Sequence, residues 1–128
     1  MTRYYCPQCW HDFAEDLNTC PDCGINIKEF YESKDYIDKL ILALKSPEAG
    51  TPVRASMILG KIKDRRAVQP LMECVQNNTD IFIVLEAIKA LGEIGDMEAI
   101  KFLVSLQDHP DKIVQDQIKA TLNSFHKE

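Results

Sequence analysis

Long apolar runs are missing from this sequence of 128 residues. No stretch approaches the ~20 consecutive apolar residues that a membrane-spanning helix needs, so we expect no membrane contact. The first residues, MTRYYC, also lack the apolar core of a signal peptide. We therefore expect a cytoplasmic protein whose thiols stay reduced.

An overall excess of basic charge is missing too. The net charge is −5 at pH 7, which disfavours nucleic-acid binding as the main role. The charge is unevenly placed, because residues 1–33 carry two basic and six acidic side chains whereas residues 34–78 carry eight basic and five acidic ones. A basic middle therefore lies between acidic ends.

The familiar catalytic motifs are also absent. We find no Ser/His/Asp order, no glycine-rich phosphate loop and no paired carboxylates suited to acid–base chemistry. Cys74, the fifth cysteine, has no histidine near it in the sequence and fits the pattern of a small buried apolar residue. We therefore predict that the chain is not an enzyme.

Cysteine, by contrast, is concentrated at the start of the chain. Two CxxC pairs, Cys6/Cys9 and Cys20/Cys23, are separated by ten residues, a spacing that lets four thiolates bind one tetrahedral Zn²⁺. Disulfides and free thiols are the alternatives, and His11 is a further candidate ligand. Four cysteines already complete a closed site, so we predict a single zinc ion with a structural role.

The two cysteine turns differ at one position. Gly24 follows the last cysteine, where such turns favour a positive φ, but Trp10 stands at the corresponding place in the first turn. The first turn is therefore strained or takes another form. The segment from Tyr5 to Gly24 resembles the short zinc ribbons of many prokaryotic proteins, which implies stabilisation or protein contact. We place a zinc ribbon at residues 1–30, folded by metal because so short a segment buries little apolar surface.

From residue 33 onward, apolar residues recur with the helical period. Six amphipathic helices joined by short turns follow, which favours antiparallel neighbours. In order, their apolar residues are Tyr36, Ile37, Leu40, Ile41 and Leu44; Val53, Met57, Ile58 and Ile62; Val68, Leu71, Met72 and Val75; Ile81, Val84, Ile88 and Leu91; Ile100, Leu103 and Val104; and Ile113, Val114, Ile118, Leu122 and Phe125.

These helices repeat after 32 residues. Leu59, Gly60, Ile62, Asp64 and Ala67 recur as Leu91, Gly92, Ile94, Asp96 and Ala99. A third copy, one residue shorter, follows. A fixed period of this size predicts a stack of helix pairs in which neighbours bury each other's apolar faces. We expect the glycines to permit close helix approach and the aspartates to cap the next helix.

The repeated Leu-Gly-x-Ile-x-Asp stretch resembles HEAT-like repeats, in the short variety known from phycobilisome bilin lyases. The resemblance implies the fold and a function in binding other proteins, but it does not imply lyase chemistry. The predicted fold is all-α: a HEAT-like right-handed solenoid of about three helix pairs at residues 33–128, preceded by the ribbon.

The leading functional prediction is a non-catalytic adaptor that binds another protein. Its docking surface is expected on the second helix of each pair and at the basic turn of the first repeat. The candidate partner-binding residues are Arg54, Lys61, Lys63, Arg65, Arg66 and Lys89. One alternative is a nucleic-acid-associated protein that uses the ribbon or residues 61–66. Another is a bilin-lyase-like enzyme or maturation factor that depends on Cys74. The oligomeric state stays open.

Overall fold

A computed structural model describes residues 3–48 and 50–126 of the chain. Its elements run in the order β1 (Tyr4–Tyr5), β2 (Asp12–Phe13), α1 (Ile27–Glu32), α2 (Tyr36–Ala43), α3 (Gly50–Ile62), a 3₁₀ turn η1 (Arg65–Ala67), α4 (Val68–Asn77), α5 (Ile81–Ile94), α6 (Met97–Ser105) and α7 (Lys112–His126). Residues 1, 2, 49, 127 and 128 belong to the two predicted units but lie outside the described residues. The side chain of Phe125, an apolar residue of the last predicted helix, also lies outside them. No helix among those described is long and apolar enough to cross a membrane.

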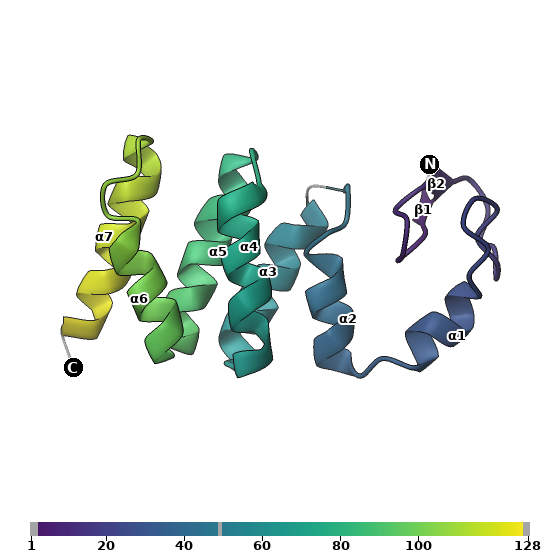
Figure 1. Cartoon of the computed structure of the whole chain (residues 1–128), viewed down its shortest axis with the longest axis horizontal. Helices are drawn as coiled ribbons and strands as arrows, with labels where there is room; N and C mark the ends of the chain where they lie inside the picture. Colours follow the sequence, from purple (N-terminus) through teal and green to yellow (C-terminus); the bar gives the residue numbers. More distant parts are fainter. Residues whose placement is uncertain (1–2, 49, 127–128) are drawn as a thin grey trace.

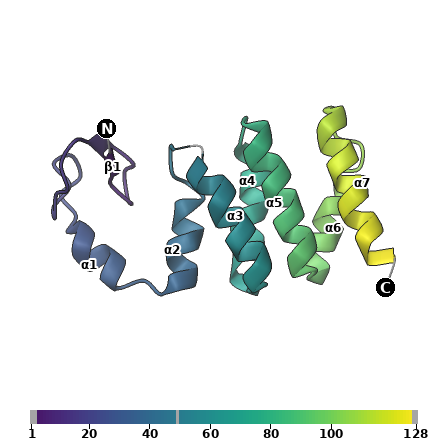
Figure 2. The same ribbon diagram turned by 180° about the vertical axis from the view of Figure 1, so that it is seen from behind.

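The six predicted helices form a two-layered stack of three helix pairs. The first helices, α2, α4 and α6, make one layer, and the second helices, α3, α5 and α7, make the other (Figures 1 and 2). The prediction of an all-α repeat fold is confirmed. The second helices pack closely on one another, whereas the first helices touch each other sparingly. The second helices therefore hold the successive pairs together.

Aspartates begin most of these helices. Asp35, Asp80 and Asp96 are the N-caps of α2, α5 and α6, and their carboxylates accept backbone N–H bonds of 2.7–2.9 Å. Such caps satisfy N–H groups that have no partner within the helix. Asp64 accepts from the Arg66 N–H and so caps the 3₁₀ turn η1, which leads into α4. The capping role expected for the repeated aspartates is confirmed, although Asp64 caps the 3₁₀ turn η1 and not the helix α4 itself.

The core runs through the whole helical stack. Leu59, Leu71, Ile88, Leu91, Leu103 and Ile118 are among its fully buried side chains. Six predicted core residues are instead exposed, and for these the prediction was wrong: Tyr36, Met57, Ile58, Ile62, Val104 and Ile113. Helical spacing locates an apolar stripe but does not say how wide a stripe the neighbours cover.

The N-terminal unit is small and only partly regular. Strands β1 and β2 pair antiparallel, with Tyr4 opposite Phe13. Helix α1, which the sequence did not predict, follows the second cysteine turn and is capped by the Asn26 side chain. It extends across residue 30, the predicted end of the ribbon. In Figure 1 the chain then turns back into α2, so the cysteine-bearing loops stand opposite the first helix pair.

Candidate functional site

The two cysteine turns have the same backbone hydrogen bonds. In the first, the Trp10 N–H donates to the Cys6 carbonyl at 2.8 Å; in the second, the Gly24 N–H donates to the Cys20 carbonyl at 3.0 Å. The thiol of Cys6 accepts two backbone N–H bonds, from the second and third residues after it, and that of Cys20 does the same. Donors from Cys23 and Asp22 lower the pKa of Cys20 to about 6. Both turns therefore direct two backbone N–H groups at the sulfur of their first cysteine.

These turns bring four sulfur atoms together. The sulfurs of Cys6, Cys9, Cys20 and Cys23 all lie within 4.8 Å of one another. The Sγ atoms of Cys6 and Cys23 are 3.5 Å apart, and those of Cys9 and Cys20 are 3.7 Å apart. A tetrahedral site with Zn–S bonds of about 2.3 Å requires sulfur atoms about 3.8 Å apart. The cluster thus has the dimensions of a four-thiolate metal site, and all four cysteines are free of disulfides.

His11 is not part of this cluster. Its Nδ1 atom lies 3.2 Å from a carboxylate oxygen of Asp22, and its side chain is largely exposed. Within residues 3–48 and 50–126, the four cysteines are the one group of three or more His, Cys, Asp or Glu residues whose ligand atoms converge. The helical repeats offer no second such group in that part of the chain.

The backbone of Trp10 shows which form the first cysteine turn takes. It adopts a left-handed backbone with φ of 61°, close to the 81° of Gly24 in the second turn. The first turn therefore keeps the same form, and the residue bears a strain that a glycine would avoid, typically about 1–2 kcal/mol. Strain of this kind is often retained where the side chain has a function.

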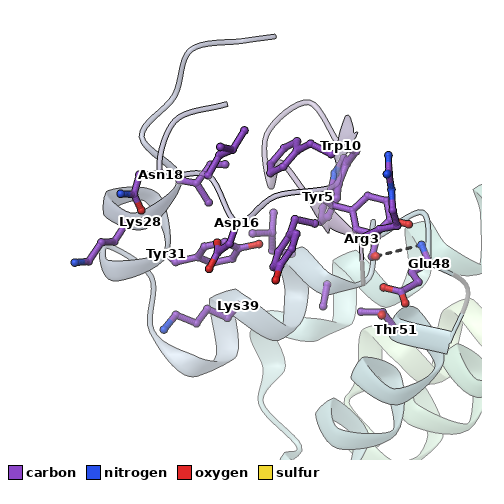
Figure 3. Close-up of a pocket in the computed structure, with 17 residues that line it drawn as sticks. Arg3, Tyr5, Trp10, Asp16, Asn18, Lys28, Tyr31, Lys39, Glu48 and Thr51 are labelled. Atoms are coloured by element: carbon purple, nitrogen blue, oxygen red, sulfur yellow. Dashed lines mark hydrogen bonds between the residues drawn. The ribbon is translucent and has the colours of Figure 1, made fainter. Parts of the chain in front are cut away.

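The side chain of Trp10 faces a cleft between the ribbon and the first helix pair (Figure 3). The cleft has a volume of about 570 Å³, within the usual range of ligand sites. The ribbon side contributes half-buried aromatic rings, among them Tyr5, Trp10 and Phe13, and α2 contributes Leu42 and Ala43. No sequence pattern predicts this cleft, because its two walls come from different units.

The predicted basic turn is largely engaged within the chain. Arg66 donates to Asp35 at 2.8 Å and to Asp64 at 3.1 Å, and Arg65 donates to Asp96 at 2.7 Å. These contacts lower the pKa of Asp64 and contribute to the lowered pKa values of Asp35 and Asp96, for which a backbone N–H is the leading cause. The two arginines therefore connect the caps of successive first helices.

The other predicted partner-binding residues lie apart from one another. Arg54 and Lys61 are exposed on α3, while Lys89 is exposed on α5 and pairs with Glu86 at 3.2 Å. Lys63, just after α3, has a φ of 62° and stands 32 residues before Gly95, which has a φ of 66°. Lys63 thus takes the left-handed position that glycine occupies at the end of α5.

Apolar side chains are exposed beside these basic residues. Phe82 on α5 and Ile113 on α7 occupy equivalent places in their repeats and are 69% and 58% exposed. We define the second-helix face by the exposed residues that recur at helical spacing on α3, α5 and α7: Arg54, Met57, Lys61, Phe82, Lys89, Glu93 and Ile113. The charged residues of this face were predicted from the sequence, but Met57 and Ile113 were predicted to lie on buried apolar stripes, and the exposure of Phe82 was not predicted.

Cys74 lies inside the helical stack. Its side chain is buried, and that burial raises the pKa of its thiol to about 11. A nucleophilic cysteine needs the opposite shift, toward the thiolate. The expectation of a small buried residue at this position is confirmed.

The helical part of the chain matches the family model of HEAT repeats over residues 37–123. The chain is 30% identical over 89 residues to a deoxyhypusine hydroxylase of Aspergillus niger, covering 68% of this chain and 26% of that protein. It is 36% identical over 77 residues to the alpha subunit of a phycocyanobilin lyase of Picosynechococcus sp., covering 55% of this chain and 28% of that protein. The chain therefore spans little more than a quarter of the length of these relatives.

Two solved structures share the fold. Human deoxyhypusine hydroxylase in complex with glycerol superposes with a TM-score of 0.66 at 22% identity, covering 72% of this chain and 32% of that one. The complex of CpcE and CpcF of phycocyanin lyase from Nostoc sp. PCC7120 superposes with a TM-score of 0.61 at 20% identity, covering 85% of this chain and 41% of that one. Both confirm the helical-repeat architecture.

These relatives correct one prediction. The expectation that the chain is not an enzyme was wrong, because its relatives are a hydroxylase and a subunit of a lyase. That expectation depended on the absence of local catalytic motifs. An active site assembled from residues far apart in the sequence leaves no such motif.

Proposed function

The chain belongs to the HEAT-repeat family, and from this premise we propose that it binds a partner protein on its second-helix face, as a subunit or module of a larger enzyme. The observation that carries the proposal is the exposure of Phe82, Ile113 and Met57 on one face of the stack. Exposed apolar side chains bordered by charged ones are typical of protein-binding surfaces.

The relatives support both parts of this proposal. One relative is a lyase subunit, and the phycocyanin lyase structure is a complex of two different chains. The present chain covers a minor part of each relative's length, so the whole activity of either relative is not assigned to it. The engagement of Arg65 and Arg66 with carboxylates of the chain itself favours a protein partner over nucleic acid.

We propose further that Cys6, Cys9, Cys20 and Cys23 hold one structural Zn²⁺ and that the ribbon depends on it for folding. The sulfur separations support this assignment, as does the donation of backbone N–H groups to two of the sulfurs. A four-thiolate zinc site has no open position for substrate. Chemistry in the assembly would then depend on other groups.

The test is affinity capture from a lysate of the native host, with and without nuclease, followed by mass spectrometry. The double variant Phe82→Asp/Ile113→Asp places two carboxylates on the second-helix face. The matched control is Met97→Asp/Val104→Asp, which changes two exposed apolar residues on α6, in the other layer. We expect a defined protein to be retained by the parent and the control and lost by the face variant.

Two results would contradict the proposal. Equal retention of the partner by both double variants would remove the second-helix face as the docking surface. Partners that disappear on nuclease treatment would indicate that the chain associates with nucleic acid instead.

A further inference from the structure

We propose that the cleft between the ribbon and the first helix pair is a second binding site, which takes an apolar segment of a partner protein with an acidic residue beside it. This site is separate from the second-helix face. Its walls come from the ribbon and α1 on one side and from α2 and the start of α3 on the other (Figure 3).

The two ends of the helical stack differ in a way that favours this site. On the outer side of the stack formed by α7, the exposed residues Lys112, Asp116 and Lys119 are charged. At the other end, α2 presents Leu42 and Ala43 to the cleft. The ribbon faces this apolar end without packing tightly on it, which leaves the space of about 570 Å³ open.

The backbone of Trp10 gives an independent reason. Glycine would satisfy the left-handed position without strain, as Gly24 does in the second turn. The indole instead lines the cleft, so the strain is compensated if the ring contacts a ligand there. Tryptophan is the residue type most enriched among side chains that dominate protein interfaces.

The charged side chains that line the cleft indicate which charge a bound segment carries. Arg3 also lines the cleft, but its guanidinium is paired with Asp12. Lys28 and Lys39 are exposed and have no salt bridge to a described residue; Figure 3 places them on the side opposite Glu48. Asp16 lies between the two sides. An acidic residue next to the apolar anchor would therefore meet the two free ammonium groups.

A peptide segment fits this cleft better than a small molecule does. Sites for small molecules usually bury a few converging polar groups that orient the ligand. Here the charged residues, Asp16 between the two sides included, are exposed side chains, and the rest of the lining is largely aromatic and aliphatic. That arrangement is typical of a groove that receives an apolar anchor and leaves the flanking peptide in water.

The test is a selection of random eight-residue peptides displayed on phage against the zinc-loaded chain of residues 1–128. We expect enrichment of peptides with a Leu, Ile, Met or Phe anchor and an Asp or Glu within a few residues. Enrichment of basic peptides, or no enrichment, would overturn the proposal. The most enriched peptide is then synthesised without tryptophan, so that Trp10, the one tryptophan of the chain, reports its binding by fluorescence.

Variants locate the bound peptide, with affinities measured by calorimetry. Trp10→Gly relieves the strained turn, so it should keep its zinc while the peptide binds at least about tenfold more weakly. Leu42→Gln, at a position outside the helical core, should weaken binding too. Lys28→Glu/Lys39→Glu should abolish the preference for acidic peptides. Unchanged affinity in Trp10→Gly or in the double lysine variant would show that the cleft is not the site.

Failure of this proposal is distinguishable from failure of the proposed function. Phe82→Asp/Ile113→Asp alters the second-helix face alone and should leave peptide affinity unchanged. If that variant lost the peptide while Trp10→Gly kept it, the peptide would bind to the second-helix face, and the cleft proposal would be wrong.

Discussion

Gly60 on α3 lies directly against Ala90 on α5. A β-carbon at residue 60 would stand 2.9 Å from the Ala90 Cα atom and 3.1 Å from its Cβ atom. The obstacle is backbone, so the two second helices would have to move apart. We predict that Gly60→Ala lowers the free energy of unfolding by about 1–3 kcal/mol, the usual cost of overpacking, measured by urea denaturation followed by circular dichroism.

Gly50→Ala is the matched control for this substitution. Residue 50 is also a helical glycine, at the start of α3, but a β-carbon there would meet one atom of the Arg54 side chain, at 3.9 Å. Since alanine favours the helix, we expect this variant to be unchanged or up to about 1 kcal/mol more stable. Equal destabilisation by both substitutions would mean that the contact with Ala90 does not limit the packing.

Substitution of Lys63 by glycine is predicted to stabilise the protein, whereas Gly60→Ala destabilises it. Its backbone is left-handed at the place where Gly95 ends the next second helix. Lys63→Gly should raise the free energy of unfolding by about 1 kcal/mol, because glycine adopts this conformation without the clash of a β-carbon. Lys61→Gly, inside the last turn of α3, should lower it by a similar amount. A loss of stability in Lys63→Gly would show that the Lys63 side chain contributes more than its backbone costs.

The repeat and its helices were predictable because their causes are local. Apolar spacing, the capping aspartates and the 32-residue offset all lie in the sequence, and residues such as Asp96 and Leu91 have the structural positions expected of them. The convergence of Cys6 and Cys9 with Cys20 and Cys23 was predictable for the same reason, since each CxxC pair forms its own turn.

The remaining features depend on contacts between distant segments. Arg66 reads as part of a basic patch, but it pairs with Asp35, which lies 31 residues earlier. Ile113 reads as part of the apolar stripe of its helix, but it is 58% exposed, like Phe82 at the equivalent place in the preceding repeat, because the neighbouring helices cover only part of that stripe. The cleft at Trp10 requires the ribbon to face α2, and no local pattern predicts how two units are placed.

The bridges made by Arg66 predict a dependence of stability on pH. The folded-state pKa values of Asp35 and Asp64 lie below the ordinary 3.8; the leading causes are the Asp38 backbone N–H for Asp35 and Arg66 for Asp64. A depressed carboxyl pKa adds stability that is complete above about pH 5 and is lost as the pH falls through about 4 and below. Arg66→Ala should therefore be less stable than the parent at pH 7, and the two should converge near pH 2.

The size of this effect is limited by solvent, because the carboxylates of both aspartates are accessible. Arg54→Ala, which removes an exposed arginine on α3 that forms no salt bridge with a described residue, is the control and should follow the parent at every pH. Urea denaturation of the parent, Arg66→Ala and Arg54→Ala at pH 7, 4 and 2 gives the free energies of unfolding to be compared. A difference between Arg66→Ala and the parent that stays constant down to pH 2 would mean that packing, and not charge, accounts for the role of Arg66.

The cysteine cluster predicts that the two units fold separately. Cys20→Ser removes one of four sulfurs, so the purified protein should lose its zinc, and the ribbon should unfold because it has little apolar core of its own. The helical circular dichroism signal should stay largely intact, since the core residues of the stack lie in α2 to α7. Cys74→Ser, in the helical core, is the control and should keep one zinc per chain. Collapse of the helices in Cys20→Ser would show that the stack depends on the ribbon, and an unchanged zinc content would exclude the four-cysteine site.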